Sequence, residues 1–339
     1  MELQTMKKSL VSLAVLAAFA GAASAQTNIT VYGVADAAIS YKDNGKATDS
    51  KTWAVDSGQL SGSRLGFKGS EDLGGGLSAI FTLENGFTID DGQQAQGRLF
   101  GRQAFVGLQG GFGAVKLGRQ YNPIRVAVEG IDPFRLAMGS WAKNVFSLYD
   151  ERADNTINYT SANFGGFTGQ LAYSFGENAT GTSIGRQLGL SGTYANGPLT
   201  AVLAYHNQNL TAGTAPAQTD AGSAKTTLLG GTYNFGPATL HAGYAWDKGN
   251  PATGADNLDN RDWMLGASAP VGGAGTVLAS YMKRDDRLAT NQDVKQWALG
   301  YTHALSKRTT LYTLFNHIDR ENVTPSTTKQ FSVGMRHTF

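Results

Sequence analysis

Apolar residues alternate with small or polar residues along most of this chain, and this period-two pattern constrains the fold more than any other feature. In one segment, Phe167, Leu171 and Phe175 share one face of the chain, whereas Thr168 and Gln170 share the other. Such alternation is typical of β-strands whose two faces meet different surroundings. About sixteen segments of this kind follow one another, at roughly 27–41, 58–70, 76–87, 98–109, 113–121, 154–163, 167–176, 186–195, 199–207, 225–235, 238–247, 261–270, 276–284, 294–304, 309–319 and 329–339.

The connections between these segments alternate between short turns and long polar loops. Residues 110–111 form a short turn, whereas 208–224 and 248–260 are long loops, and 122–153 is the longest. A soluble β-sandwich rarely alternates its connections in this way, and the repeat of about 40 residues that marks a propeller is not visible. In lipid every backbone group must be paired, so a sheet that crosses a membrane closes, with its apolar face outward. The sequence therefore predicts an all-β fold, a 16-stranded antiparallel transmembrane β-barrel, which leaves an aqueous channel.

Composition excludes several other classes of protein. The 339 residues carry 28 Lys and Arg against 26 Asp and Glu, and this near balance argues against a nucleic-acid partner. Cysteine is absent, so thiolate metal sites and cysteine nucleophiles are excluded. The five histidines are scattered, with no catalytic or metal-ligand spacing. We therefore expect no enzyme activity, no metal and no cofactor.

The first 25 residues have the features of a cleaved secretory signal peptide. Lys7 and Lys8 precede an apolar run at 10–20, and small residues at 23–25 form a cleavage site. Translation from Met6 would give the same mature chain. We expect residues 26–339 to form the barrel, since no later run of 18 or more apolar residues predicts a transmembrane helix.

Several motifs spread over the whole mature chain are similar to those of one known family. Through these motifs the chain resembles the trimeric general porins of Gram-negative outer membranes, in particular the betaproteobacterial type. They are VYGVAD at 31–36, SGSRLGFKGSEDLGGGL at 61–77, RLFGRQAFVGL at 98–108, LGRQYNP at 117–123, NYTSANFGGF at 158–167, ALSKRT at 304–309 and VGMRHTF at 333–339.

The resemblance implies an outer-membrane homotrimer through which small hydrophilic solutes and ions diffuse passively. It also implies that the third long loop, 122–153, folds into the barrel and narrows it. The terminal Phe339 matches the family's signal for outer-membrane insertion. The implied partners are the barrel assembly machinery, outer-membrane lipid and lipopolysaccharide.

Candidate residues of the pore constriction come from strand alternation and from the resemblance. Alternation with Leu65 places Arg64 and Lys68 on the lumenal face, although Lys68 also fits a solvated charge at the rim. Arg102 is expected on the lumenal side with Ala104. The resemblance adds Arg152, so that Arg64, Arg102 and Arg152 form a basic ladder, a use that suits the permanently charged guanidinium group.

The same reasoning gives candidates for the acidic side of the pore constriction and one arginine that points out of the barrel. The resemblance nominates Asp132 for the acidic side of the constriction, with Glu129 as a weaker candidate. Arg119 shares its face with Leu117, so we expect it to point outward, into the trimer interface. Arg135 stands close to Asp132 and offsets its charge, which predicts weak to moderate anion selectivity.

Other functions of a barrel stay open at this point. A substrate-specific channel for small anionic solutes or sugars would show saturable flux. A structural or adhesive barrel would show no solute flux.

Overall fold

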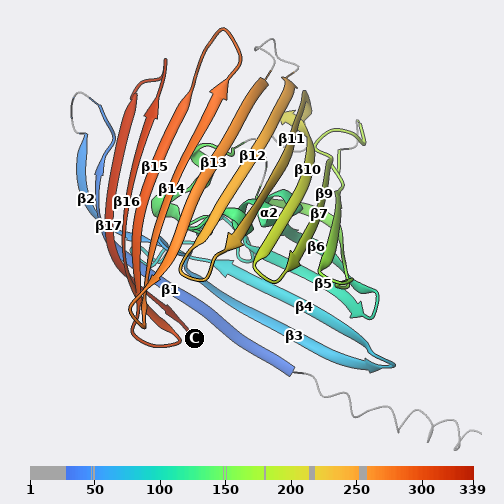
Figure 1. Ribbon diagram of the computed structural model, residues 1–339. Helices are drawn as coiled ribbons and strands as arrows, with labels where there is room; N and C mark the ends of the chain where they lie inside the picture. The colour runs from blue at the N-terminus through green and yellow to red at the C-terminus, as the bar shows by residue number, and fades with distance from the viewer. Residues whose placement is uncertain are drawn as a thin grey trace, which may run out of the picture.

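The computed structural model describes residues 28–46, 48, 50–147, 149, 151–178, 181–213, 218–251 and 258–339. The expected signal peptide, residues 1–25, lies outside the described residues. Within them, the strands form a single antiparallel sheet that closes on itself where β1 pairs with β17 (Figure 1). The strands are β1 (Asn28–Asp43), β2 (Lys51–Ser57), β3 (Arg64–Gly74), β4 (Leu77–Gly86), β5 (Gln103–Gly110), β6 (Gly113–Tyr121), β7 (Arg152–Ser161), β8 (Phe167–Ser174), β9 (Gln187–Asn196), β10 (Leu199–Ala212), β11 (Thr219–Asn234), β12 (Thr239–Pro251), β13 (Leu258–Val271), β14 (Gly275–Asp286), β15 (Val294–Ala304), β16 (Thr309–Arg320) and β17 (Thr327–Thr338).

The 17 strands occupy sixteen positions around the barrel, because β2 and β3 both pair with β1 and together form one barrel strand. β2 pairs with one part of β1, where Ala37 lies opposite Ser57, and β3 pairs with the preceding part, where Val34 lies opposite Arg64. The predicted 16-stranded antiparallel barrel is therefore confirmed. The expected continuous strand over 58–70 is wrong in its first six residues, which leave the sheet.

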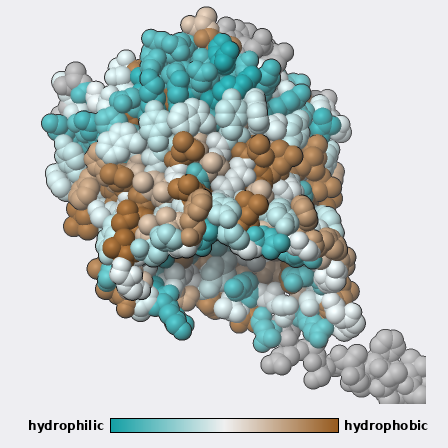
Figure 2. Space-filling model, viewed as in Figure 1, coloured by the Kyte–Doolittle hydropathy of each residue, from teal (hydrophilic) through white to brown (hydrophobic). Residues whose placement is uncertain are grey.

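The outer and inner faces of the wall differ as the alternation predicts. Tyr281 and Trp297 are exposed on the outer face, whereas their neighbours Ser280 and Gln296 are buried. Gln296 faces inward, since its amide nitrogen donates to the carbonyl of Ser140 in the interior, at 3.2 Å. On the surface, apolar side chains gather in a band below a hydrophilic cap (Figure 2).

Residues 58–63 interrupt the second barrel strand, between the segments in which β2 and β3 pair with β1. The buried carboxylate of Asp36 accepts hydrogen bonds from this segment. The Asp36 side chain accepts the N–H groups of Leu60, at 3.2 Å, and Ser61, at 2.8 Å, and also the hydroxyl of Tyr312. Gly58 turns the chain with a φ of 70°. Two of the backbone N–H groups released by the break, those of Leu60 and Ser61, thus find an acceptor within the barrel, as buried polar groups require.

The third long connection folds into the barrel, as predicted. It contains α2 (Pro123–Ile131) and two short 3-10 helices, η1 (Met138–Ser140) and η2 (Ala142–Asn144). In Figure 1, α2 lies behind the front strands, inside the barrel. Proline in its first turn suits a helix start.

One face of α2 is apolar and packs against the inner wall. The buried residues of this face share a cluster with wall residues of β10, β11, β13 and β14, and this burial holds the connection inside the barrel. The helix residues are Ile124, Ala127, Val128 and Ile131, and the wall residues include Val202, Leu228, Met264 and Met282.

None of the helices in the described part of the chain combines the length and apolar composition needed to cross a bilayer.

Replacing Asp36 by alanine tests the role of the carboxylate at the strand break. The change removes the acceptor for Leu60, Ser61 and Tyr312, and a buried donor left without a partner costs about 1–3 kcal/mol. We expect Asp36→Ala to lower the free energy of unfolding by about 2–4 kcal/mol. Urea unfolding in phospholipid vesicles, followed by tryptophan fluorescence, measures this. The exposed Asp90→Ala is the control, and equal midpoints for both variants would contradict the assignment.

Candidate pore constriction

We name the connection that contains α2 the constriction loop. A cavity of about 770 Å³ lies between this loop and a wall formed by β1, the strand break before β3, and single residues of β3, β4 and β5. Arginine and glutamate side chains dominate its charged lining, and two tyrosines, Tyr32 and Tyr121, accompany them. The charged residues are Arg64, Arg102, Arg125, Arg135 and Arg152, together with Glu84, Glu129 and Glu151.

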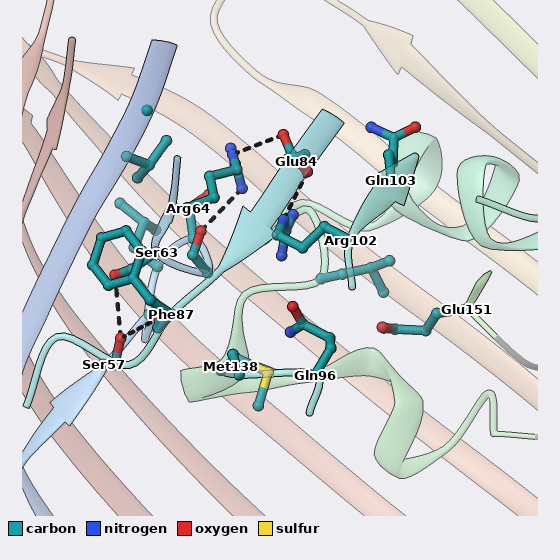
Figure 3. Close-up of a pocket in the computed structure, with 18 of the residues that line it drawn as sticks. Ser57, Ser63, Arg64, Glu84, Phe87, Gln96, Arg102, Gln103, Met138 and Glu151 are labelled. Carbon is teal, nitrogen blue, oxygen red and sulfur yellow. Dashed lines mark hydrogen bonds and ion pairs between the residues drawn. The ribbon is translucent and has the colours of Figure 1, made fainter. Parts of the chain in front are cut away.

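Glu84 on β4 holds the two arginines of the wall. Arg102 Nε donates to Glu84 Oε1 at 2.8 Å, and Arg64 Nε lies 3.8 Å from Oε2. Figure 3 shows both guanidinium groups turned toward this one carboxylate. Tyr32 also donates its hydroxyl to Glu84, at 2.9 Å. Because ion pairs and hydrogen bonds fix these groups, the two positive charges occupy set positions at the edge of the cavity.

Tyr121, the last residue of β6, joins the wall arginines to those of the loop. Its hydroxyl accepts Arg102 Nη2 at 2.7 Å and Arg152 Nη2 at 3.1 Å. The guanidinium carbons of Arg125 and Arg152 lie 3.9 and 4.6 Å from the centre of its ring. Both contacts are within the range of cation–π attraction. Tyr121 therefore positions three arginines at once.

The loop contributes carboxylates that pair with its own arginines. Glu151 lies 2.9 Å from Arg152 Nη1. Glu129 pairs with Arg125 one helical turn earlier and lies 3.9 Å from Arg135 Nη2. Five arginines and three glutamates line the cavity, so positive side chains exceed negative ones by two.

The structure brings four of the predicted constriction residues together at this cavity: Arg64, Arg102, Arg152 and Glu129. Lys68 is exposed and is not part of the cavity lining; its Nζ lies 5.2 Å from the centre of the Tyr32 ring.

Asp132 lies away from the cavity, within the loop. Its side chain is 1% exposed, and its oxygens accept the N–H groups of Phe134, at 3.0 Å, and Leu136, at 2.9 Å. These bonds hold a turn in which Arg135 and Leu136 adopt φ angles of 53° and 59°. Burial raises the pKa of Asp132 to about 6. The carboxylate thus shapes the loop at this point.

Arg102 reaches the cavity by a different route from the one expected. Ala104 pairs with Arg119, and its neighbour Val106 pairs with Leu117; Val106 and Leu117 are 58% and 50% exposed, so these residues occupy the outer face. The expectation that Arg102 shares a lumenal face with Ala104 is therefore wrong. Arg102 precedes β5, outside the strand alternation, and its side chain turns inward from that bend.

Arg119 lies on the outer face, where it takes part in a small charge cluster. Its Nη1 lies 2.7 Å from Asp154, which also pairs with Arg98 at 2.8 Å. Arg119 Nε donates to the carbonyl of Gly101 at 2.8 Å. The terminal Phe339 exchanges backbone hydrogen bonds with Gly33 on β1. The trimer contact of Arg119 and the insertion role of Phe339 stay predictions.

Sequence reasoning missed Tyr121 and the loop residues Arg125 and Glu151. The available signal was the place of Tyr121 at the junction between a strand and the Asn-Pro start of the long loop. In the part of the chain that the structure describes, no group of three or more His, Asp or Glu side chains could hold a metal ion.

A closed barrel with an inward loop and a charged cavity defines an outer-membrane channel. The chain belongs to the Gram-negative porin family, whose profile matches residues 12–323. Outer membrane porin protein 32 of Delftia acidovorans is 42% identical over 294 residues, which cover 83% of this chain and 81% of that protein. The predicted family and the predicted outer-membrane location are thus confirmed.

Solved structures agree with the fold. A structure described as an anion-selective porin from Comamonas acidovorans is 32% identical and has a TM-score of 0.82, over 93% of this chain and 100% of that one. The trimer form of OmpT from Vibrio cholerae, 15% identical, has a TM-score of 0.71 over 92% of this chain and 99% of that one, which shows the fold alone. The chain is therefore an outer-membrane porin, a channel for small solutes.

Replacing Tyr121 by phenylalanine tests whether this residue positions the arginines. The variant keeps every charge but removes the oxygen that accepts Arg102 and Arg152. We expect the zero-current potential across a salt gradient to move toward zero, because the two guanidinium groups lose a shared fixed partner. The matched control is Tyr159→Phe, since the Tyr159 hydroxyl donates to the carbonyl of Phe112 at a turn far from the cavity. A potential unchanged in Tyr121→Phe would refute this role.

Proposed function

We propose that this porin is a water-filled, anion-preferring channel for small hydrophilic solutes, assembled as a homotrimer. The observation that carries the proposal is the excess of arginine over glutamate at the cavity beside the constriction loop. In a narrow passage with low-dielectric walls, fixed charges act strongly on a passing ion. Rings of arginine favour anions in such passages.

The pairing of charges predicts moderate rather than strong selectivity. Glu84 offsets part of the charge of Arg64 and Arg102, and Glu151 offsets that of Arg152. The excess of two positive side chains remains to attract anions. The Comamonas acidovorans relative, described as anion-selective, supports the same preference.

Two observations support the homotrimer. The Vibrio cholerae protein with this fold has a trimer form. On the outer face of this chain, the cluster of Arg98, Arg119 and Asp154 lies next to exposed apolar residues such as Val106 and Leu117. A charged cluster beside apolar residues suits contact with a second protein chain better than contact with hydrocarbon alone. Outer-membrane lipid, lipopolysaccharide and the barrel assembly machinery complete the proposed partners.

A substrate-specific channel for small anionic solutes is the alternative. Several guanidinium groups around one cavity could bind a carboxylate through paired hydrogen bonds. Flux that saturates and that a competitor blocks would favour this alternative, whereas flux proportional to solute concentration supports general diffusion. We propose no enzyme activity for this chain.

Charge substitutions in the cavity give a signed test of the proposal. At about 6 Å in water, one charge changes the energy of an anion by about 0.7 kcal/mol and that of a cation by about the same amount in the opposite direction. The permeability ratio of anion to cation therefore changes by about tenfold. We expect Arg152→Ala to lower the anion-to-cation permeability ratio by about this factor and Glu129→Gln to raise it. Zero-current potentials in a planar bilayer measure the ratio.

Lys68→Ala is the control, because it removes a positive charge outside the cavity lining, and its ratio should stay near that of the wild type. Conductance in three equal steps would support the trimer. Equal effects of Arg152→Ala and Lys68→Ala, or a fall in the ratio with Glu129→Gln, would contradict the proposed filter.

A further inference from the structure

The inner wall carries a row of glycines directly beneath the constriction loop, which we name the glycine track. If each had a Cβ atom, that atom would lie only 2.6–2.8 Å from a side chain of the loop. Ordinary contacts between carbon atoms are about 3.5–4.0 Å. A residue with a Cβ atom at any of these positions would therefore force a side chain of the loop to move. The track consists of Gly189 on β9, Gly230 on β11, Gly243 on β12, Gly266 on β13 and Gly300 on β15.

The loop residues meet the track in the order of the chain. Pro123 lies against Gly189 at the start of α2, and Phe134 against Gly300 beyond its end. Pro133 lies against Gly266 between these two points. Residues later in the loop thus meet strands later in the sheet, and the line of contact runs along the wall from β9 to β15, with no glycine contributed by β10 or β14. We call this line of contact the seat of the loop.

The backbone conformation does not require glycine in the track. The φ angles of its members lie outside the left-handed region, in contrast to turn glycines such as Gly74 and Gly75. Glycine inside a strand weakens the sheet and often marks a close approach by another group. Glycine at these positions therefore leaves room for the side chains of the constriction loop.

Ile131, the last residue of α2, occupies the centre of the seat. It is fully buried, and its Cδ1 lies 2.7 Å from the position of a Cβ on Gly230 and 2.6 Å from that on Gly243. The two glycines face each other across β11 and β12. The Ile131 carbonyl also lies 3.0 Å from the Nδ1 atom of His241 on the same wall. The end of the helix is thus fixed against the wall by packing and by a hydrogen bond.

The opposite side of α2 faces the pore. Arg125 and Glu129 line the cavity, whereas Val128 and Ile131 are buried on the wall side. A rigid helix that moved away from the wall would carry both charged side chains further into the cavity. The distance between α2 and the wall therefore determines how far these two charged side chains reach into the cavity.

We propose that the glycine track is a positioning site that sets the depth of the constriction loop and, through it, the open cross-section of the pore. This inference rests on the proposed channel function. A methyl group at Gly243 would force the Ile131 side chain away by about 1 Å to restore ordinary contact. The wall cannot yield in the other direction, because the paired strands on either side hold it.

A pair of substitutions tests the seat. In Gly243→Ala, the new methyl meets Ile131 Cδ1, and we expect the single-channel conductance to shift below that of the wild type. Valine at 131 lacks this Cδ1 atom, and Cγ1 lies at an ordinary 3.8 Å from the new methyl. We therefore expect the double variant Gly243→Ala with Ile131→Val to regain the wild-type conductance, with Ile131→Val alone staying close to it.

The chain offers a matched control in Gly192 on β9. A Cβ there would meet no atom within 4 Å, so Gly192→Ala changes a strand glycine without touching the loop. Its conductance should equal that of the wild type. If Gly243→Ala does not fold, as judged by the heat-dependent shift of the folded band in a gel, folding should return in the double variant for the same reason.

The outcomes separate the two claims. A wild-type protein without conductance steps would overturn the proposed channel and, with it, this inference. A conducting wild type together with an unchanged Gly243→Ala would overturn the inference alone. So would a double variant that recovers neither the conductance nor the folding lost in Gly243→Ala.

Discussion

The need to pair every backbone N–H and C=O group in a medium without water governs this structure. The sheet meets that need by closing between β1 and β17. Where residues 58–63 leave the sheet, Asp36 provides acceptors for two of their N–H groups inside the barrel. Closure then divides the side chains of each strand between an outer and an inner face, and the interior becomes a polar space into which the third long connection can fold.

The position of that connection determines the chemistry of the interior. The apolar face of its helix packs on the wall, and the charged face lines the cavity. Tyr121, directly before the connection, binds arginines of both the wall and the loop. The glycine track adds the distance of approach, because a wall with side chains at these positions would keep the helix further out. Selectivity and pore width are therefore two consequences of one packing arrangement between loop and wall.

The alternation of residues was enough to predict the closed barrel and its number of strands, because both follow from local periodicity and connection length. The break at 58–63 was not predictable, since it depends on Asp36 and Tyr312, which are far away in sequence. Alternation also failed for Arg102, which lies just outside its strand. Asp132 was predicted for the acidic side from a motif position, but its burial becomes visible only with the turn around it. The role of Gly243 depends on Ile131, more than one hundred residues earlier in the chain.

The proposed preference of this channel for anions rests on the excess of arginine at the cavity. The most direct test is the zero-current potential of the purified wild-type protein in a planar bilayer, across a gradient of potassium chloride. We expect a potential of the sign that chloride permeation generates. A potential of the opposite sign, showing preference for potassium, would contradict it.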